Sequence, residues 1–238
     1  MSGTNEGIMT ITYITDSRVL AVPIAECNEQ LVDLKNYDGI LFGEPPETPL
    51  AAPHYTKMRA TVLEKLRDAQ KALPNGWVFR LYEGFRSLAV QKMLFEEEYA
   101  RVAKRLPNAA HQTIFNEATH LASPVINLDG TKNIPPHNTG AAVDIEILAE
   151  DGSLVDMGMT AADWIRVHPD LCLTKSPCVS TAVQKNRDIL LAVMHEVGFV
   201  NYPTEWWHFS YGDRYWAYIS GKSHAIYGAA EDFLSSVS

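Results

Sequence analysis

An aspartate within a mostly apolar segment is the feature that most constrains how this chain can fold. Residues 142–148 read Ala-Val-Asp-Ile-Glu-Ile-Leu, and this apolar, β-branched composition predicts a strand. The carboxylate of Asp144 is costly to bury in such a strand unless it is paired or bound to a metal. Either the fold brings partners to Asp144, or the strand lies at an edge and Asp144 faces solvent.

A first candidate partner precedes the strand. His137 opens the stretch His-Asn-Thr-Gly-Ala-Ala-Val-Asp that ends at Asp144. Pro135 and Pro136 restrict the backbone that leads into the histidine, and Gly140 permits a sharp bend. This stretch alone is equally compatible with a loop histidine and a solvent-facing aspartate.

A second stretch, Glu205-Trp206-Trp207-His208, favours a metal site. Two histidines and one carboxylate leave one position of a tetrahedral zinc open to water, and the remaining carboxylate, Glu205, could act as the base for that water. The sequence therefore predicts a zinc hydrolase. Residues three apart on a regular strand face opposite sides, so Glu205 and His208 can share one site only if Glu205 lies at a bend.

Other interpretations of these residues remain open. Glu-x-x-His also occurs in di-iron helical bundles, which need several such motifs, whereas this chain has one. The His-Glu-x-x-His motif of zincins is absent. An aromatic core strand with polar ends is the purely structural alternative. A third element, Glu83-Gly84-Phe85-Arg86, would place a guanidinium at a strand end, where it could hold an oxyanion, although a surface position is the default for an arginine.

The combination of residues 84–86, 137–144 and 205–208, in this order and rough spacing, resembles the metallopeptidases of the D-alanyl-D-alanine dipeptidase family. That family includes the vancomycin-resistance dipeptidases, and the resemblance extends over about residues 30–215.

The resemblance implies specific roles. Zinc would be held by His137, Asp144 and His208. Glu205 would be the general base and acid, and Arg86 would polarise the scissile carbonyl and steady the oxyanion.

Four departures from the family pattern concern the surroundings of these residues. The arginine turn has Glu83 and Phe85 where the family has Asp and Tyr, and Pro135-Pro136 precede the histidine in place of a Ser and a small or basic residue. The family's substrate-ammonium aspartate corresponds to Asp163, displaced by one residue. The stretch 106–134 is longer than usual and could cover the site.

The favoured function is zinc-dependent hydrolysis of a small peptide, with D-Ala-D-Ala or a related dipeptide as the first candidate. One alternative is a D,D-carboxypeptidase that acts on longer peptidoglycan stem peptides. Another is a zinc-containing module that binds peptides without cleaving them, and a metal-free structural domain is a further possibility. The presence of both Glu205 and Arg86 argues against a module that only binds peptides, because binding without cleavage needs neither residue.

Hydrophobic periodicity predicts the fold class. Apolar spacing predicts helices at about 55–73, 88–105 and 181–197, the last with Thr181 as a possible N-cap. Strands are expected at 77–83, 142–148, 199–202 and 206–211, with short strands and loops over 10–50 and irregular structure over 106–136. We expect a single α+β domain over 1–238, a mostly antiparallel central sheet with helices packed on it. Residues 1–10 and 229–238 are candidate flexible ends.

Composition limits the partners and the compartment. The net charge of -9 argues against nucleic acid and anionic membrane surfaces, and no apolar run approaches the ~20 residues of a membrane span. Met1 to Thr10 lacks signal-peptide character. The three cysteines, Cys27, Cys172 and Cys178, are too widely spaced for a CxxC motif and are expected to be reduced, small buried side chains. A cytoplasmic enzyme of unspecified oligomeric state is the expectation.

Overall fold

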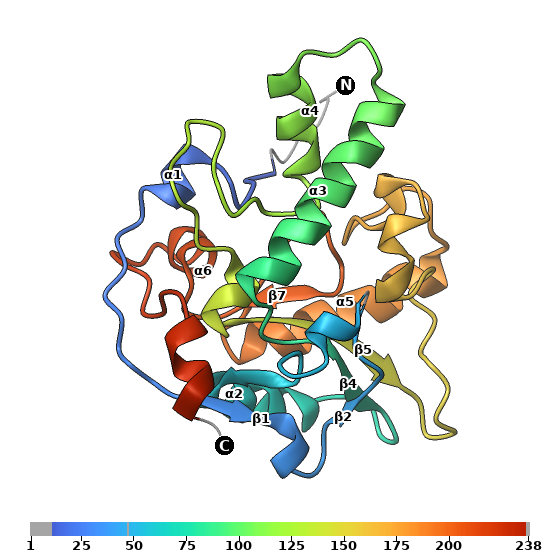
Figure 1. Cartoon of the computed structure of the whole chain (residues 1–238). Helices are drawn as coiled ribbons and strands as arrows, with labels where there is room; N and C mark the ends of the chain where they lie inside the picture. Colours follow the sequence, from blue (N-terminus) through green and yellow to red (C-terminus); the bar gives the residue numbers. More distant parts are fainter. Residues whose placement is uncertain (1–10, 47, 237–238) are drawn as a thin grey trace, which may run out of the picture.

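The computed structural model describes residues 11–46 and 48–236 (Figure 1). The described residues form helices α1 Ser17–Leu20, α2 Ala60–Gln70, α3 Leu88–Arg105, α4 His111–Ala118, α5 Thr181–Glu196 and α6 Arg214–Ile219. Their strands are β1 Leu31–Asp33, β2 Leu41–Phe42, β3 Lys57–Arg59, β4 Val78–Glu83, β5 Ala142–Leu148, β6 Val200–Asn201 and β7 His208–Ser210. Short 3₁₀ turns include η3 Pro136–Thr139, η4 Ala161–Ile165 and η6 Glu231–Ser236.

The main sheet has the strand order β2-β4-β5-β7-β6 within the described residues. The β2–β4 pair is parallel and the other three pairs are antiparallel, while β1 and β3 form a separate antiparallel pair. This arrangement confirms the predicted α+β class with a mostly antiparallel sheet. The predicted strand at 142–148 is β5, which lies in the middle of the sheet between β4 and β7.

The two faces of β5 differ in chemistry because side chains alternate along a strand. Val143, Ile145 and Ile147 are fully buried in the main core, together with apolar residues of α2 and α5. Asp144 lies on the opposite face, where it lines a cavity beside residues of α3. In Figure 1, α3 crosses in front of the sheet while α5 lies behind it. The central strand therefore carries a carboxylate toward α3 without exposing it.

Hydrophobic periodicity predicted where the long helices lie more accurately than the residues at which they begin and end. The predicted helix 55–73 begins only at Ala60, because residues 57–59 pair with β1 as strand β3. Helix α5 is capped by the side chain of Ser180, not Thr181. Residues 106–136 are not wholly irregular, since α4 forms there and packs its Ile114 and Ala118 against Val102 of α3.

A β-bulge shapes the sheet beside the candidate site. Leu81 pairs with Ile145, but the next pair joins Glu83 to Asp144, so Tyr82 is an extra residue on β4. Such bulges redirect side chains and often lie next to active sites. Here the bulge brings Glu83 opposite Asp144 and turns Tyr82 toward the cavity that Asp144 lines.

From the sequence, the two ends of the chain are expected to be flexible. Residues 1–10 lie outside the described residues. Near the other end, Glu231 of η6 accepts hydrogen bonds from the backbone of Leu88 and the side chain of Asn138.

All three cysteines are free, but only Cys172 is buried. The prediction that all three are buried is therefore wrong for Cys27 and Cys178, which lie on solvent-exposed segments.

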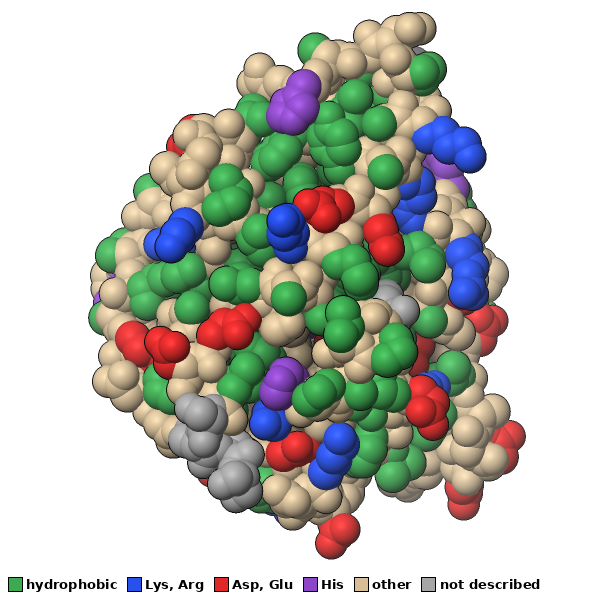
Figure 2. Space-filling model, in the orientation of Figure 1, with side chains coloured by type: hydrophobic (Ala, Val, Ile, Leu, Met, Phe, Trp, Pro, Cys, Tyr) green, Lys and Arg blue, Asp and Glu red, His purple; other side chains and the backbone are tan. Residues whose placement is uncertain are grey.

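The molecular surface mixes charges of both signs. Figure 2 shows acidic and basic side chains scattered among apolar ones on the face toward the viewer. Among the helices of the described residues, none is both long and apolar enough to cross a membrane.

Candidate active site

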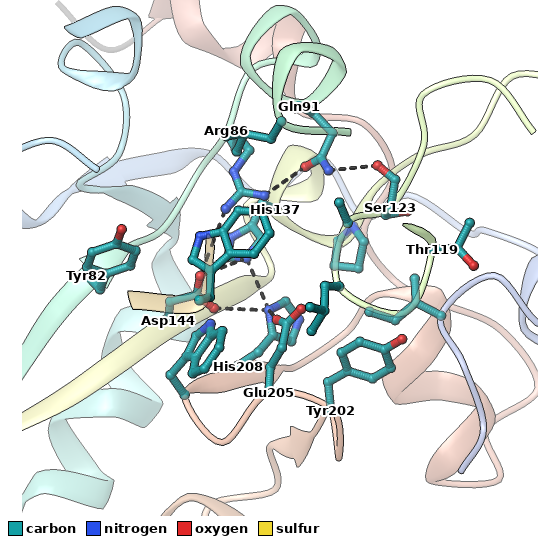
Figure 3. A pocket seen from close by; sticks show the side chains of 17 residues that line it. Tyr82, Arg86, Gln91, Thr119, Ser123, His137, Asp144, Tyr202, Glu205 and His208 are labelled. Carbon is teal, nitrogen blue, oxygen red and sulfur yellow. Dashed lines mark hydrogen bonds and ion pairs between the residues drawn. The ribbon is translucent and has the colours of Figure 1, made fainter. Parts of the chain in front are cut away.

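Two imidazoles and a carboxylate converge on the sheet face toward α3. His137 comes from η3, Asp144 from β5 and His208 from the neighbouring strand β7, where Asp144 and His208 are direct partners. His137 Nε2 lies 3.1 Å from His208 Nδ1 and 3.4 Å from Asp144 Oδ2, and His208 Nδ1 lies 3.0 Å from Asp144 Oδ1. These atoms all fall within 4.8 Å of one another (Figure 3).

Two glycines let the backbone hold His137 in place. Gly140 ends η3 in the left-handed region, with φ of 69°, which favours glycine. Gly84 lies so close to the backbone that a Cβ there would approach the Lys57 carbonyl oxygen to 2.4 Å. The Gly84 carbonyl in turn lies 2.7 Å from His137 Nδ1. Since a carbonyl only accepts hydrogen bonds, Nδ1 carries the proton and Nε2 points a lone pair into the site.

The donor set fits a metal ion. Nε2 of His137 faces the site as an acceptor, as do the oxygens of Asp144, and Nδ1 of His208 lies within hydrogen-bond distance of both. His208 can place its proton on Nε2, which lies 3.4 Å from the Ser210 hydroxyl. Three lone pairs then converge without a proton between them, an arrangement that a divalent cation stabilises. Two imidazoles and one carboxylate with an open position are ligands typical of catalytic zinc.

The electrostatics of the group favour an ionised carboxylate. All three side chains are buried. Burial by itself would raise the pKa of Asp144, but when the imidazoles of His137 and His208 are protonated, their charges and hydrogen bonds hold that pKa well below its ordinary value. The carboxylate is therefore negative over the working pH range, as a metal ligand must be.

Glu205 lies at the bend that the sequence required. A turn precedes β7, in which the backbone N–H of Glu205 donates to the Tyr202 carbonyl and that of His208 donates to the Glu205 carbonyl. The carboxylate oxygen Oε2 of Glu205 thereby comes to 3.6 Å from His208 Nδ1. Figure 3 shows both side chains directed into one cavity. A carboxylate at this position can exchange protons with a group bound next to the three convergent ligands.

Arg86 is held at the opposite side of the cavity by two acceptors. Its guanidinium donates from both Nε, at 3.0 Å, and Nη2 to Oε2 of Glu83, and from Nη1 to the Gln91 side chain at 3.1 Å. Nη2 also lies 4.0 Å from Asp144 Oδ2. Charge-assisted hydrogen bonds from three nitrogens hold the guanidinium plane in one orientation. The arginine is thus oriented before any substrate arrives.

These residues line one narrow, largely buried cavity with a volume of about 40 Å³. Its walls also include side chains that the sequence did not single out. Tyr82 comes from the bulge, Gln91 and Leu94 from α3, Trp164 from η4 and Tyr202 from the turn before β7. The segment that follows α4 contributes Thr119, Leu121, Ala122 and Ser123. Their contribution depends on which segments meet in space, for which the sequence gives no local signal. The segment 119–123 does cover the site, as the long 106–134 stretch suggested.

Asp163 is the predicted site residue that the structure does not bring to this group. Its carboxylate caps η4, accepting hydrogen bonds from the N–H of Thr160 at 2.9 Å and from its hydroxyl at 2.8 Å. These bonds lower the pKa of Asp163. Asp163 is not among the residues that line the cavity, whereas its neighbour Trp164 is. The one-residue displacement seen in the sequence thus turns an aromatic side chain, not the carboxylate, toward the site.

Comparisons with known proteins agree with this geometry. The Peptidase M15 family model, described as D-ala-D-ala dipeptidase, matches residues 56–224. A D-alanyl-D-alanine dipeptidase of Synechocystis sp. is 29% identical over 240 residues, covering 89% of this chain and 96% of the relative. The D-alanyl-D-alanine dipeptidase of Escherichia coli K12 is 38% identical over 73 residues, covering 31% and 36%. The structure of VanYB in complex with D-Alanine-D-Alanine has a TM-score of 0.45 at 17% identity, covering 92% of this chain and 97% of VanYB.

The family model spans most of the chain, from the residues just before β3 to those after α6, and includes all five residues of the predicted zinc machinery. The convergence of two histidines and a carboxylate within that span supplies the ligands such an enzyme needs. The chain is a zinc metallopeptidase and belongs to the D-Ala-D-Ala dipeptidase family, Peptidase M15.

Proposed function

We propose that this enzyme hydrolyses D-Ala-D-Ala or a closely related free dipeptide. The observation that carries the proposal is the single narrow cavity lined by Arg86, His137, Asp144, Glu205 and His208. The relatives named D-alanyl-D-alanine dipeptidase support the same substrate class.

In the proposed mechanism, His137, Asp144 and His208 hold zinc, whose chemistry is to acidify a water and polarise a carbonyl. Glu205 takes the proton of the attacking water at its carboxylate and later delivers a proton to the leaving amine. Arg86, held by Glu83 and Gln91, directs its guanidinium toward the negative charge that develops on the substrate oxygen. The buried walls of the cavity exclude bulk water and so strengthen these charge interactions.

The rival activity, trimming of longer stem peptides, needs a groove that is open beyond the cleaved bond. Leu121, Ala122 and Trp164 add apolar side chains to the wall of the cavity, and we propose that they limit the room for a longer stem peptide. The three free thiols support the proposal that the enzyme works in a reducing compartment such as the cytoplasm.

A substrate screen tests the proposal directly. The zinc-loaded enzyme is assayed on D-Ala-D-Ala, L-Ala-L-Ala, N-acetyl-D-Ala-D-Ala and a stem pentapeptide. We expect cleavage of the free D,D-dipeptide and little cleavage of the acetylated or longer substrates. Equal cleavage of the pentapeptide would replace the dipeptidase with the carboxypeptidase, and no cleavage of any substrate would favour a binding module.

Glu205→Gln tests the assigned base. Glutamine preserves the shape of the side chain but cannot take up a proton, so kcat should fall by at least ~10² while zinc content stays at one ion per chain. An active Glu205→Gln enzyme would mean that another group serves as the base.

A further inference from the structure

The outer nitrogen of His208 contacts a residue of its own strand. The imidazole presents Nδ1 to Asp144 and His137, and its Nε2 lies 3.4 Å from the hydroxyl of Ser210. Ser210 is fully buried on β7. Metal-bound histidines generally donate their second ring N–H to an acceptor, which fixes the tautomer and the ring orientation. Ser210 is in the right place to be that acceptor.

A buried carboxylate lies beyond Ser210. Asp213 is 2% exposed. One oxygen of Asp213, Oδ1, accepts the backbone N–H of Trp216 at 2.8 Å and caps α6. The other, Oδ2, is buried and has no hydrogen-bond partner among the described residues. Burial raises the pKa of Asp213, and Ser210 is one of the groups that act against that rise, so Oδ2 is an acceptor available to the serine next to a proposed zinc ligand.

We propose that Ser210 and Asp213 act as positioning residues that orient His208 for zinc. A hydroxyl has a single proton, so a Ser210 hydroxyl that donates to Oδ2 of Asp213 can accept from Nε2–H of His208. The Nδ1 lone pair is then left facing Asp144 and His137. This inference rests on the proposed function, in which His208 is a ligand. Neither Ser210 nor Asp213 lines the substrate cavity, so both act through His208.

Helix capping is the competing explanation for Asp213, and one substitution separates the two. Asparagine caps helices about as well as aspartate, but it replaces one of the two carboxylate oxygens with an amide NH₂, which cannot accept a hydrogen bond from the Ser210 hydroxyl. Asp213→Asn therefore keeps the cap of α6 and weakens the proposed chain of hydrogen bonds.

The test measures zinc affinity by competition with a chelator, independently of activity. The proteins are the wild type, Ser210→Ala, Asp213→Asn and the double variant. Ser210→Ala should bind zinc about 10–100-fold more weakly, the loss typical when such outer partners are removed. Asp213→Asn should also weaken binding. The double variant should bind about as well as Ser210→Ala alone, because the two residues act in one chain.

Ser180→Ala is the matched control. Ser180 caps α5 through its side chain and, like Ser210, loses only a hydroxyl. Its zinc affinity should equal that of the wild type. Thermal unfolding of each metal-free protein checks that the fold is retained.

His208→Ala separates failure of this inference from failure of the metal assignment. If His208→Ala loses zinc while Ser210→Ala and Asp213→Asn bind like the wild type, the positioning role is overturned and the metal site stands. Independent, additive losses in the double variant would also overturn it. If His208→Ala binds zinc like the wild type, the metal assignment itself fails.

Discussion

At the scale of single residues, the orientation of Arg86 determines what can replace it. Its Nε and Nη2 engage Glu83 and its Nη1 engages Gln91, three contacts from one planar fork. An ammonium is a point charge and cannot make them together. Arg86→Lys should therefore lower kcat by about 10², the loss seen when one oxyanion donor is removed, while zinc content is unchanged. Turnover near the wild-type rate would remove Arg86 from the mechanism.

The cysteines allow a second residue-scale prediction. Burial raises the pKa of Cys172 to about 12, so at pH 8 only about 10⁻⁴ of this thiol is the reactive thiolate. Cys27 and Cys178 are exposed. A chromogenic thiol reagent should modify two thiols of the native protein rapidly, and the third only in denaturant. Replacing Cys172 with Ala should leave the two fast reactions unchanged, and rapid reaction of all three thiols in the native protein would contradict the prediction.

At the scale of elements, α3 holds the wall of the cavity in place. Arg101 of α3 lies over the Trp164 ring of η4 at 4.9 Å from its centroid and pairs with buried Glu98. Such a cation–π contact fixes the indole where it lines the cavity. The proposed preference for short substrates would thus depend on the packing of η4 against α3.

Trp164→Ala should open that wall. We expect the preference for free over N-acetylated D-Ala-D-Ala, measured as the ratio of kcat/KM values, to fall by about tenfold or more. Arg101→Ala should produce a smaller change in the same direction. Arg105→Ala is the control, because Arg105 is on the same helix but pairs with Glu117 of α4. An unchanged ratio in Trp164→Ala would mean that another segment limits substrate length.

At the scale of the whole molecule, zinc should join segments that are distant in sequence. Its proposed ligands come from η3, β5 and β7, and binding only to the folded state adds stability by mass action. At free zinc about 1,000 times Kd this amounts to about 4 kcal/mol. A chelator should therefore lower Tm by several degrees, and re-addition of zinc should restore it. In His208→Ala the chelator should have almost no effect, and an equal fall there would place the stabilising ion elsewhere.

The sequence by itself determined the chemistry of this protein and its regular elements. The motifs around His137 and Glu205 contain the metal-binding side chains, which can be recognised from residue type and spacing. Helix 88–105 and strand 142–148 follow from local periodicity and have the observed bounds. An aspartate buried in a mostly apolar strand indicated in advance that partners must converge on it, because the energy of an unpaired buried charge is prohibitive.

Only the tertiary structure decided which segments meet around that chemistry. Residues 57–59 are a strand because they pair with β1, although their own periodicity favours a helix. The cavity walls and the bulge at Tyr82 depend on long-range pairing. Asp163 caps a turn while Trp164 faces the cavity. A shift of one residue reverses which side chain points inward, and only packing between distant segments fixes that choice.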